Sequence, residues 1–264
     1  MTNIHQTAVH GFSAGAATYV AGRPDYPPEI ETWLVEELNL SGGKTALDLA
    51  AGTGKFSPRL LATGAGVIAV EPVRAMLDQL VRQYPEIDAR SGSAQHIPLD
   101  DASVDAVVCA QAFHWFATSE AVQEIWRVLK PGGAFGLVWN VRDESVPWVA
   151  DLGRIMKPFE GDAPRFSSQK WRNVFPAEGF TPLRERQFTH RHTGPAEKVI
   201  IDRILSVSFM AALPAAEQEV ITARLKDVIA SYPELAGKAE VTFPYKTLAC
   251  VSNKLPYTPT GEML

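Results

Sequence analysis

The stretch Thr45-Ala-Leu-Asp-Leu-Ala-Ala-Gly52-Thr-Gly54 joins a short apolar run to a pair of glycines. Residues 45–50 predict a buried strand, and the residues after Gly54 place Phe56 and Leu60 on one face of a helix. Glycines at such a strand-to-helix turn let a ligand approach the backbone and meet the free amides of the helix N-terminus. The stretch therefore predicts a ligand-binding turn in an α/β sheet.

An acidic residue, Glu71, ends the next predicted strand, which covers residues 67–70. A carboxylate at that place can accept hydrogen bonds from both hydroxyls of a ribose, which favours an adenosine-containing cofactor. A P-loop does not fit, because Phe56 stands where Ser or Thr should follow the lysine. A dinucleotide turn fits poorly, because Ser57 stands where its third glycine should be. The case for NAD as the cofactor is therefore weakened but not eliminated.

The rest of the chain continues to alternate between strands and helices. Further strands are expected at 88–91, 104–110, 134–139, 183–192 and 241–251. The strands lack polar alternation and the first five are joined by amphipathic segments, which predicts a mostly parallel sheet with helices on both faces. Two helical stretches, divided by Pro214, lie between the last two expected strands and predict a lid.

Composition excludes several classes of protein. The 264 residues are 46% hydrophobic with a net charge of -5, as in an ordinary folded soluble protein, and the absence of a basic block disfavours a nucleic-acid surface. No apolar run approaches about 20 residues, so no membrane span is expected. Cys109 and Cys250 form no CxxC pair, and His190 and His192 lack visible partners, so no metal is expected. The first residues lack signal-peptide features, which favours the cytoplasm.

The pattern Asp48-x-x-x-Gly52-x-Gly54 resembles the first motif of class I S-adenosylmethionine-dependent methyltransferases. Four other stretches resemble the same family, and the likeness is strongest to its small-molecule branch (type 11), which includes trans-aconitate methyltransferase-like and ubiquinone-biosynthesis-like enzymes. These stretches are Gly92-Ser-Ala-Gln95 followed by Ile97-Pro-Leu99; Gln111-Ala-Phe-His-Trp-Phe116; Lys130-Pro-Gly-Gly133; and the N-terminal set Phe12, Ser13, Tyr19, Arg23, Pro24, Tyr26 and Pro27.

The resemblance implies a Rossmann-like, doubly wound, mostly parallel seven-stranded sheet with helices on both faces. It implies one domain over residues 1–264, with an N-terminal helical cap at about 8–38, a cofactor-binding core at about 44–145 and a helical lid at about 194–237 before the last strand. The implied cofactor is S-adenosyl-L-methionine.

The family motifs also imply which residues form the site. The expected cofactor-binding residues are Tyr19, Arg23, Asp48, Ala50, Gly52, Thr53, Gly54, Glu71, Pro72, Met76, Ser93, Ala94 and Gln111. Many relatives place Asp or Asn at the position of Ser93 to read adenine, so the backbone near Ala94 is expected to take over that contact. Tyr19 and Arg23 would close over the methionine end, with Arg23 near a carboxylate of either cofactor or acceptor.

The acceptor is expected to be a small molecule, because Cys109-Ala-Gln111 differs from the Asn- or Asp-Pro-Pro-Tyr sequence that resembles nucleic-acid amino methylation. The expected acceptor pocket consists of Tyr26, Phe113, His114, Trp115 and Trp139, with His114 as a candidate general base for a hydroxyl or amine. A carboxylate would need no base. In-line displacement at the methyl carbon is the expected reaction.

Two alternatives remain open at this point: an NAD-dependent oxidoreductase, and a cofactor-binding module of the same fold without turnover. No nucleic-acid or membrane partner is expected, and the chain is expected to act as a monomer or a homodimer.

Overall fold

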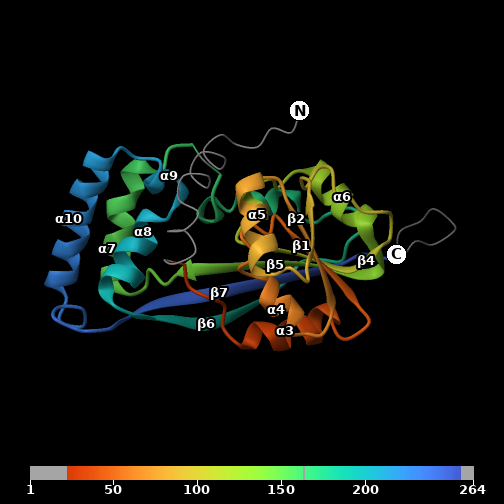
Figure 1. Cartoon of the computed structure of the whole chain (residues 1–264), viewed down its shortest axis with the longest axis horizontal. Coiled ribbons are helices and arrows are strands. Elements are labelled where there is room, and N and C mark those ends of the chain that lie inside the picture. Colours follow the sequence, from red (N-terminus) through yellow and green to blue (C-terminus); the bar gives the residue numbers. More distant parts are fainter. Residues whose placement is uncertain (1–22, 163, 257–264) are drawn as a thin grey trace.

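The computed structural model describes residues 23–162 and 164–256. Its strands form one sheet of seven in the order β3-β2-β1-β4-β5-β7-β6 (Figure 1). They are β1 (Thr45–Leu49), β2 (Gly66–Glu71), β3 (Asp88–Ser91), β4 (Val104–Ala110), β5 (Leu129–Arg142), β6 (Arg184–Gly194) and β7 (Val241–Asn253). β1 to β5 pair in parallel, and β7 runs antiparallel to both β5 and β6. The expected doubly wound, mostly parallel sheet is confirmed.

Helices cover both faces of this sheet. The helices are α3 (Glu29–Leu38), α4 (Ser57–Leu61), α5 (Arg74–Gln83), α6 (Ser119–Val128), α7 (Pro147–Met156), α8 (Arg203–Leu205), α9 (Ser208–Ala211) and α10 (Ala215–Ser231), with a π-helix η5 (Glu197–Asp202) and short 3-10 turns η1 (Phe113–Trp115), η2 (Lys157–Phe159), η3 (Phe166–Ser168) and η4 (Lys170–Val174). One apolar core lies between the sheet and α3, α4 and α5. A second lies on the opposite face, between the sheet and α6 and η4. Because both faces are covered, the inner strands are almost continuously buried.

Glycine allows the closest approach between a helix and the sheet. A Cβ at Gly136 of β5 would lie 2.8 Å from Leu38 Cδ2 and 3.2 Å from the Trp33 ring, both of which belong to α3. A side chain at residue 136 would therefore force Leu38 to move and would crowd the Trp33 ring. This helix is the C-terminal part of the expected cap, and it packs on the sheet; the first part of that cap lies outside the described residues.

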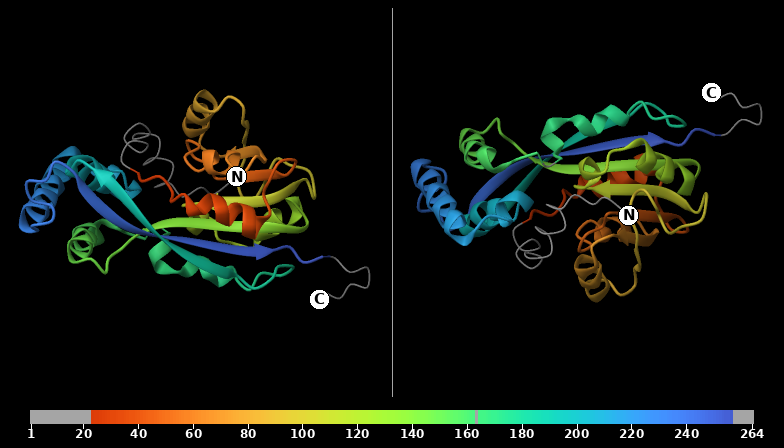
Figure 2. Two further views of the ribbon diagram at one scale, coloured as in Figure 1. Left: turned by 90° about the horizontal axis from the view of Figure 1, so that it is seen from below. Right: turned by 90° about the horizontal axis from the view of Figure 1, so that it is seen from above.

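A third apolar core lies beyond the carboxyl end of β5. It joins α7, η5, α8 and α10 to the start of β7, with Val241, Phe243 and Tyr245 contributed by the strand. Figure 2 shows the long strands β5, β6 and β7 running from the central sheet to these helices. The helices between β6 and β7 thus form where the sequence predicted them, and they gather beside the strand ends at which ligands collect in such sheets. Their action as a lid stays a prediction, as do the domain boundaries.

β5 is longer than the sequence predicted. The apolar pattern covers residues 134–139, whereas the strand continues through Asn140 to Arg142. Its pairing with β4 ends at Val138, and the last residues are held by β7 instead, where Arg142 pairs with Tyr245. The antiparallel partner satisfies the backbone of a polar extension that has no apolar signature of its own. In the part of the chain that the structure describes, no helix is both long and apolar enough to cross a bilayer.

Candidate active site

A cavity of about 930 Å³ opens at the carboxyl ends of the parallel strands. At one end it is lined by the residues that follow β1, β2, β3 and β4, and at the other by β5, η3 and the helices α8 and α9. β1 lies between β2 and β4, so the cavity sits where the winding of the sheet reverses direction. Open α/β sheets bind their ligands at this place.

Two non-glycine residues with left-handed backbone flank that point. Ala50 follows β1 with φ 58°, and Gln111 follows β4 with φ 61°. The Gln111 amide donates to the Val138 carbonyl at 2.8 Å, which ties its turn to β5. Such backbone costs about 1–3 kcal/mol and persists only where neighbouring structure holds it, often at functional sites. Both residues line the cavity.

Glu71 lies at the end of β2 with its carboxylate held by the backbone. Oε2 accepts from the Gly52 amide at 2.8 Å, and Oε1 accepts from the Val73 amide at 2.8 Å. Burial nevertheless raises the pKa of Glu71 to about 7, although the two amide hydrogen bonds oppose the shift; the nearby Asp48 adds to it. The glycine turn and the acid are thus one unit, and the carboxylate lines the cavity.

Asp48 of β1 is buried on the opposite side of the same turn. Its Oδ2 accepts a hydrogen bond from Ser57 Oγ at 2.7 Å, at the first residue of α4. Burial raises the pKa of Asp48 to about 6, and the Ser57 hydroxyl opposes the shift. The residue braces the start of α4 and also lines the cavity.

The two glycines of the turn have different roles. Gly52, with φ 60°, lines the cavity opposite Met76, whose Sδ would lie 3.8 Å from a Cβ at residue 52. Gly54 does not line it; a Cβ there would lie 3.0 Å from both Leu80 and Tyr84 of the α5 region. The second glycine therefore permits close packing against α5, and its contact with the cofactor stays a prediction.

The residues expected around the nucleoside also converge on the cavity. Thr53, Pro72, Met76, Ser93 and Ala94 line it. Ser93 and His96 form an isolated β-bridge that closes the turn after β3. This turn presents the backbone of residues 92–94 beside the loop that carries Glu71.

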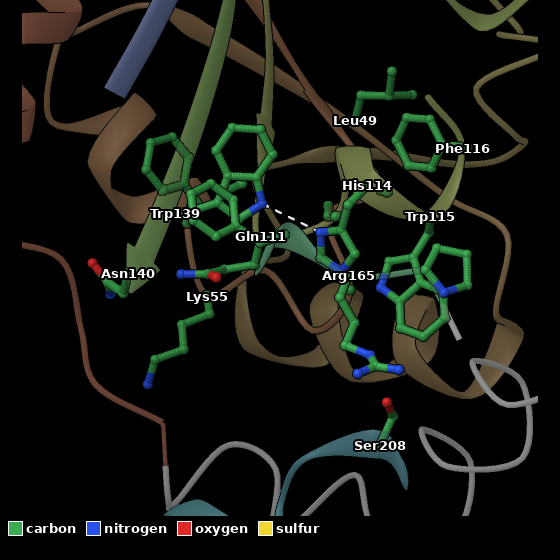
Figure 3. Close-up of a pocket in the computed structure, with 18 of the residues that line it drawn as sticks. Leu49, Lys55, Gln111, His114, Trp115, Phe116, Trp139, Asn140, Arg165 and Ser208 are labelled. Atoms are coloured by element: carbon green, nitrogen blue, oxygen red, sulfur yellow. Dashed lines mark hydrogen bonds between the residues drawn. The ribbon is translucent and has the colours of Figure 1, made fainter. Parts of the chain in front are cut away.

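His114 lies in η1, directly after β4. Its Nδ1 accepts a hydrogen bond from Trp139 Nε1 at 3.3 Å, so its proton is placed on Nε2 (Figure 3). Burial, with a smaller contribution from the Arg23 charge, lowers the pKa of His114 to about 3. At neutral pH the ring is therefore an uncharged donor, and this geometry does not support the expectation that it is a general base.

The aromatic residues of the expected acceptor pocket divide into two groups. Tyr26, Trp115 and Trp139 line the cavity. Phe113 does not: it is fully buried among Phe116 and Phe135 in the apolar core. Placing Phe113 in the pocket was wrong, because the 3-10 turn directs neighbouring side chains to opposite sides. Tyr19 lies outside the described residues.

Sequence reasoning missed most of the charged residues at the acceptor end. The cavity is also lined by Lys55, Asn140, Arg142, Glu144, Glu160, Arg165 and Arg203. Figure 3 shows Arg165 pointing toward Ser208, whereas Lys55 extends toward the opposite side of the view. The one available signal was the charged dipeptide Asp202-Arg203 between the apolar residues Ile201 and Ile204 of the expected lid. Among the described residues, no cluster of His, Cys, Asp and Glu could hold a metal ion.

Comparisons with known proteins agree with this geometry. A family model described as a methyltransferase domain matches residues 47–137. An uncharacterized methyltransferase-like protein of Schizosaccharomyces pombe is 42% identical over 93% of this chain and 96% of its own. An uncharacterized methyltransferase of Mycobacterium tuberculosis is 40% identical over 91% of this chain and 93% of its own. A solved structure from Anaeromyxobacter dehalogenans, named as a provisional type II methyltransferase, has a TM-score of 0.64 at 24% identity and covers 89% of this chain and 99% of its own.

Proposed function

The chain belongs to the class I S-adenosylmethionine-dependent methyltransferases, and on this premise we propose that its cavity transfers a methyl group from that cofactor to a small-molecule acceptor. One observation carries the proposal: a single cavity joins the nucleoside-binding features after β1, β2 and β3 to a separate charged and aromatic wall formed by β5, η3, α8 and α9. Cofactor and acceptor can therefore meet in one continuous cavity.

The cofactor end has the donors and acceptors that an adenosine moiety needs. Glu71 is placed to accept from the ribose hydroxyls, and its carboxylate is already oriented by two backbone amides. Ser93, Ala94 and Met76 line the same end of the cavity, where the first two would border adenine and Met76 would pack against its face. Asp48 and the Ala50 carbonyl lie toward the amino-acid part, and Arg23 offers a cation for the carboxylate of that part.

The cofactor supplies an electrophilic methyl carbon on a sulfonium that departs as a neutral thioether. The residues of this chain hold the nucleophile in line and exclude water, and alignment alone can supply about 7–11 kcal/mol in favourable cases. His114 contributes an Nε2–H donor and no free basic nitrogen. An acceptor atom that is already deprotonated fits such a site better than one that needs a strong base.

The partners of the protein remain those that the sequence predicts. We infer a small-molecule acceptor without nucleic-acid or membrane partners, in a cytoplasmic monomer or homodimer, and the net charge of -5 supports the first of these inferences. The type 11, trans-aconitate methyltransferase-like branch likewise stays a prediction.

Calorimetry with S-adenosylhomocysteine and with NADH tests the cofactor assignment. We expect saturable binding of the first and none of the second, and binding of the first should fall at least about 10-fold in Glu71→Ala. Transfer of a labelled methyl group to a panel of small molecules then tests turnover. Binding without transfer to any compound would identify a cofactor-binding module, and NADH binding alone would identify an oxidoreductase.

A further inference from the structure

Two arginines from distant parts of the chain line the acceptor end of the cavity. Arg142 ends β5, and Arg203 begins α8 in the segment between β6 and β7. Arg203 is only 7% exposed, and the side chain of Arg142 is 21% exposed. Charged groups are seldom buried this far unless they are paired.

These two guanidinium groups lack the partners that buried arginines need. Among residues 23–162 and 164–256, no acceptor reaches the buried Nε and Nη1 of Arg203 or the buried Nε of Arg142. The only ion pair of Arg142 in the same ranges is with Glu144, at 3.8 Å, which is too long for a hydrogen bond. The phenolic oxygen of Tyr245, in register with Arg142 on β7, is also buried and unpartnered within the described part of the chain.

Two other arginines, Arg127 and Arg59, are paired in the usual way. Arg127 donates to Glu124 and Asp101, and Arg59 donates to Asp25 and Glu31. The contrast shows that the chain does supply carboxylates where an arginine serves only the fold. A buried donor without an acceptor costs about 1–3 kcal/mol, and more when it is charged.

The charges around the pair favour an anion from outside. Burial and the like charge of Arg203 lower the pKa of Arg142, whereas Tyr245, Glu144 and Glu160 raise it. Glu160 is paired with Arg165, and Glu144 is exposed, so neither carboxylate neutralises Arg203. Two mutually repelling cations beside an open cavity provide several unused donors.

We propose that Arg142 and Arg203, with the Tyr245 hydroxyl, bind an oxyanion group of the methyl acceptor, so that the substrate is a small acid carrying a carboxylate or a phosphate. The inference rests on the proposed function and names its substrate class. Guanidinium groups suit both kinds of oxyanion, because their planar donors pair with two oxygens at once. The bound group would also join α8 to the end of β5, elements that the described side chains leave unconnected at this point.

Thermal unfolding with simple anions tests the site directly. Sodium succinate and inorganic phosphate are added at constant ionic strength to the protein saturated with S-adenosylhomocysteine. We expect a saturable rise of the unfolding temperature with at least one of them, and a loss of apparent affinity of about 10-fold or more in Arg203→Met and in Arg142→Met. Arg186→Met is the matched control, because Arg186 is an exposed arginine of β6 outside the cavity lining and should leave the response unchanged.

The variants also separate a failed inference from a failed fold or a failed cofactor assignment. The ligand-free Arg203→Met protein should be at least as stable as the parent, because an unpaired buried charge is removed, and its affinity for S-adenosylhomocysteine should be unchanged. If the parent fails to bind that compound, the proposed function fails, and the anion response of the ligand-free protein then decides this inference. An equal anion response in the parent and Arg203→Met, or none in the parent, would overturn it.

Labelled methyl transfer distinguishes the two kinds of acid. The panel contains mono- and dicarboxylic acids, phosphate monoesters, and the neutral amides and esters of the same compounds. We expect transfer only to members of one acidic group, with KM raised by Arg203→Met and kcat less affected. Neutral counterparts methylated as well as the acids would contradict the inference.

Discussion

The indole Nε1 of Trp139 donates a hydrogen bond to Nδ1 of His114 across 3.3 Å, from the fifth strand to the turn after the fourth. The bond occupies the nitrogen that a general base would use and leaves Nε2 as a donor toward the ligand. Burial, with a smaller contribution from the Arg23 charge, keeps the imidazole uncharged, with a pKa lowered to about 3. The strand pairing that brings these two residues together therefore defines the chemistry of His114.

The first prediction concerns the titration of His114. Because its pKa in the folded protein is about 3, the ring stays neutral from pH 5 to 8. The plot of turnover rate against pH should therefore show no inflection near pH 6.5 that can be assigned to His114 by its loss in His114→Gln. The unfolded chain would take up a proton near pH 6.5, so the contribution of this residue to stability is complete above that pH and is lost as the pH falls toward 3.

NMR of the imidazole carbons measures that titration directly. Trp139→Phe removes a donor to the neutral ring and should raise the pKa of His114 only slightly, because burial remains, whereas Trp148→Phe, in the separate core beside α7, should leave it unchanged. A parent His114 that titrates near pH 6.5 would contradict the assignment and restore the base role.

The second prediction concerns Glu71. Its pKa is raised to about 7 in the folded protein, so between pH 4.5 and 7 the folded state holds a proton that the unfolded state has lost. Stability is therefore fully present below pH 4.5 and falls as the pH rises through 7, by about 3 kcal/mol in all. Chemical unfolding from pH 4.5 to 8 should show this slope, and Glu71→Gln should reduce it to the part below pH 6 that the raised pKa of Asp48 supplies.

Cofactor binding provides an independent check on the same carboxylate. Ribose hydroxyls donate to its ionised form, so binding of S-adenosylhomocysteine near pH 6.5 should release a proton and tighten as the pH rises. Calorimetry in two buffers of different ionisation enthalpy measures the proton count. Equal heats in both buffers would show that Glu71 does not titrate on binding.

The third prediction separates packing from backbone strain at Gly54. Gly54→Ala should destabilise the protein by about 2–3 kcal/mol, because the methyl group meets Leu80 and Tyr84 at 3.0 Å in addition to the cost of φ 82°. Gly43→Ala has the same backbone conformation, φ 83°, and open space, so it should cost only the strain, about 1 kcal/mol. Urea unfolding measures both, and equal losses would show that packing at Gly54 is unimportant.

The fourth prediction concerns Lys254, a buried lysine after β7. Its Nζ donates to the carbonyls of Trp126 and Leu129 at 2.8 and 2.7 Å and lies 3.7 Å from the centre of the Trp126 ring. Lys254→Met should destabilise the protein by about 2 kcal/mol, because two carbonyls at the end of α6 lose a charged donor. Affinity for S-adenosylhomocysteine should not change.

Lys246→Met is the matched control for that variant. Lys246 lies on β7, the strand that precedes Lys254, and pairs with Asp143 at 2.8 Å, but its side chain is 42% exposed, so its loss should cost no more than about 1 kcal/mol. Unfolding in urea compares the two, and a Lys254→Met protein as stable as Lys246→Met would remove the structural role.

Local pattern was sufficient to predict the cofactor end of the site. The apolar run before Gly52, the turn itself and Glu71 belong to one strand-helix-strand unit, in which each element positions the next. Parallel pairing of adjacent strands then places Glu71 beside Gly52 with few alternatives, as the 2.8 Å hydrogen bond shows. The packing role of Gly54 could not be predicted in the same way, because its neighbours, Leu80 and Tyr84, are known only once α5 is packed.

The acceptor end depended on the packing of segments that are distant in the sequence. A polar stretch such as Asn140–Arg142 becomes a strand only because β7 pairs with it, and Arg203 meets that strand only when the helices after β6 pack on β7. Phe113 and His114 are adjacent in the chain, yet one enters the core and the other the cavity. Hydrophobic periodicity reports which segments are buried, but side-chain direction and long-range charge pairing arise only from the assembled sheet and helices.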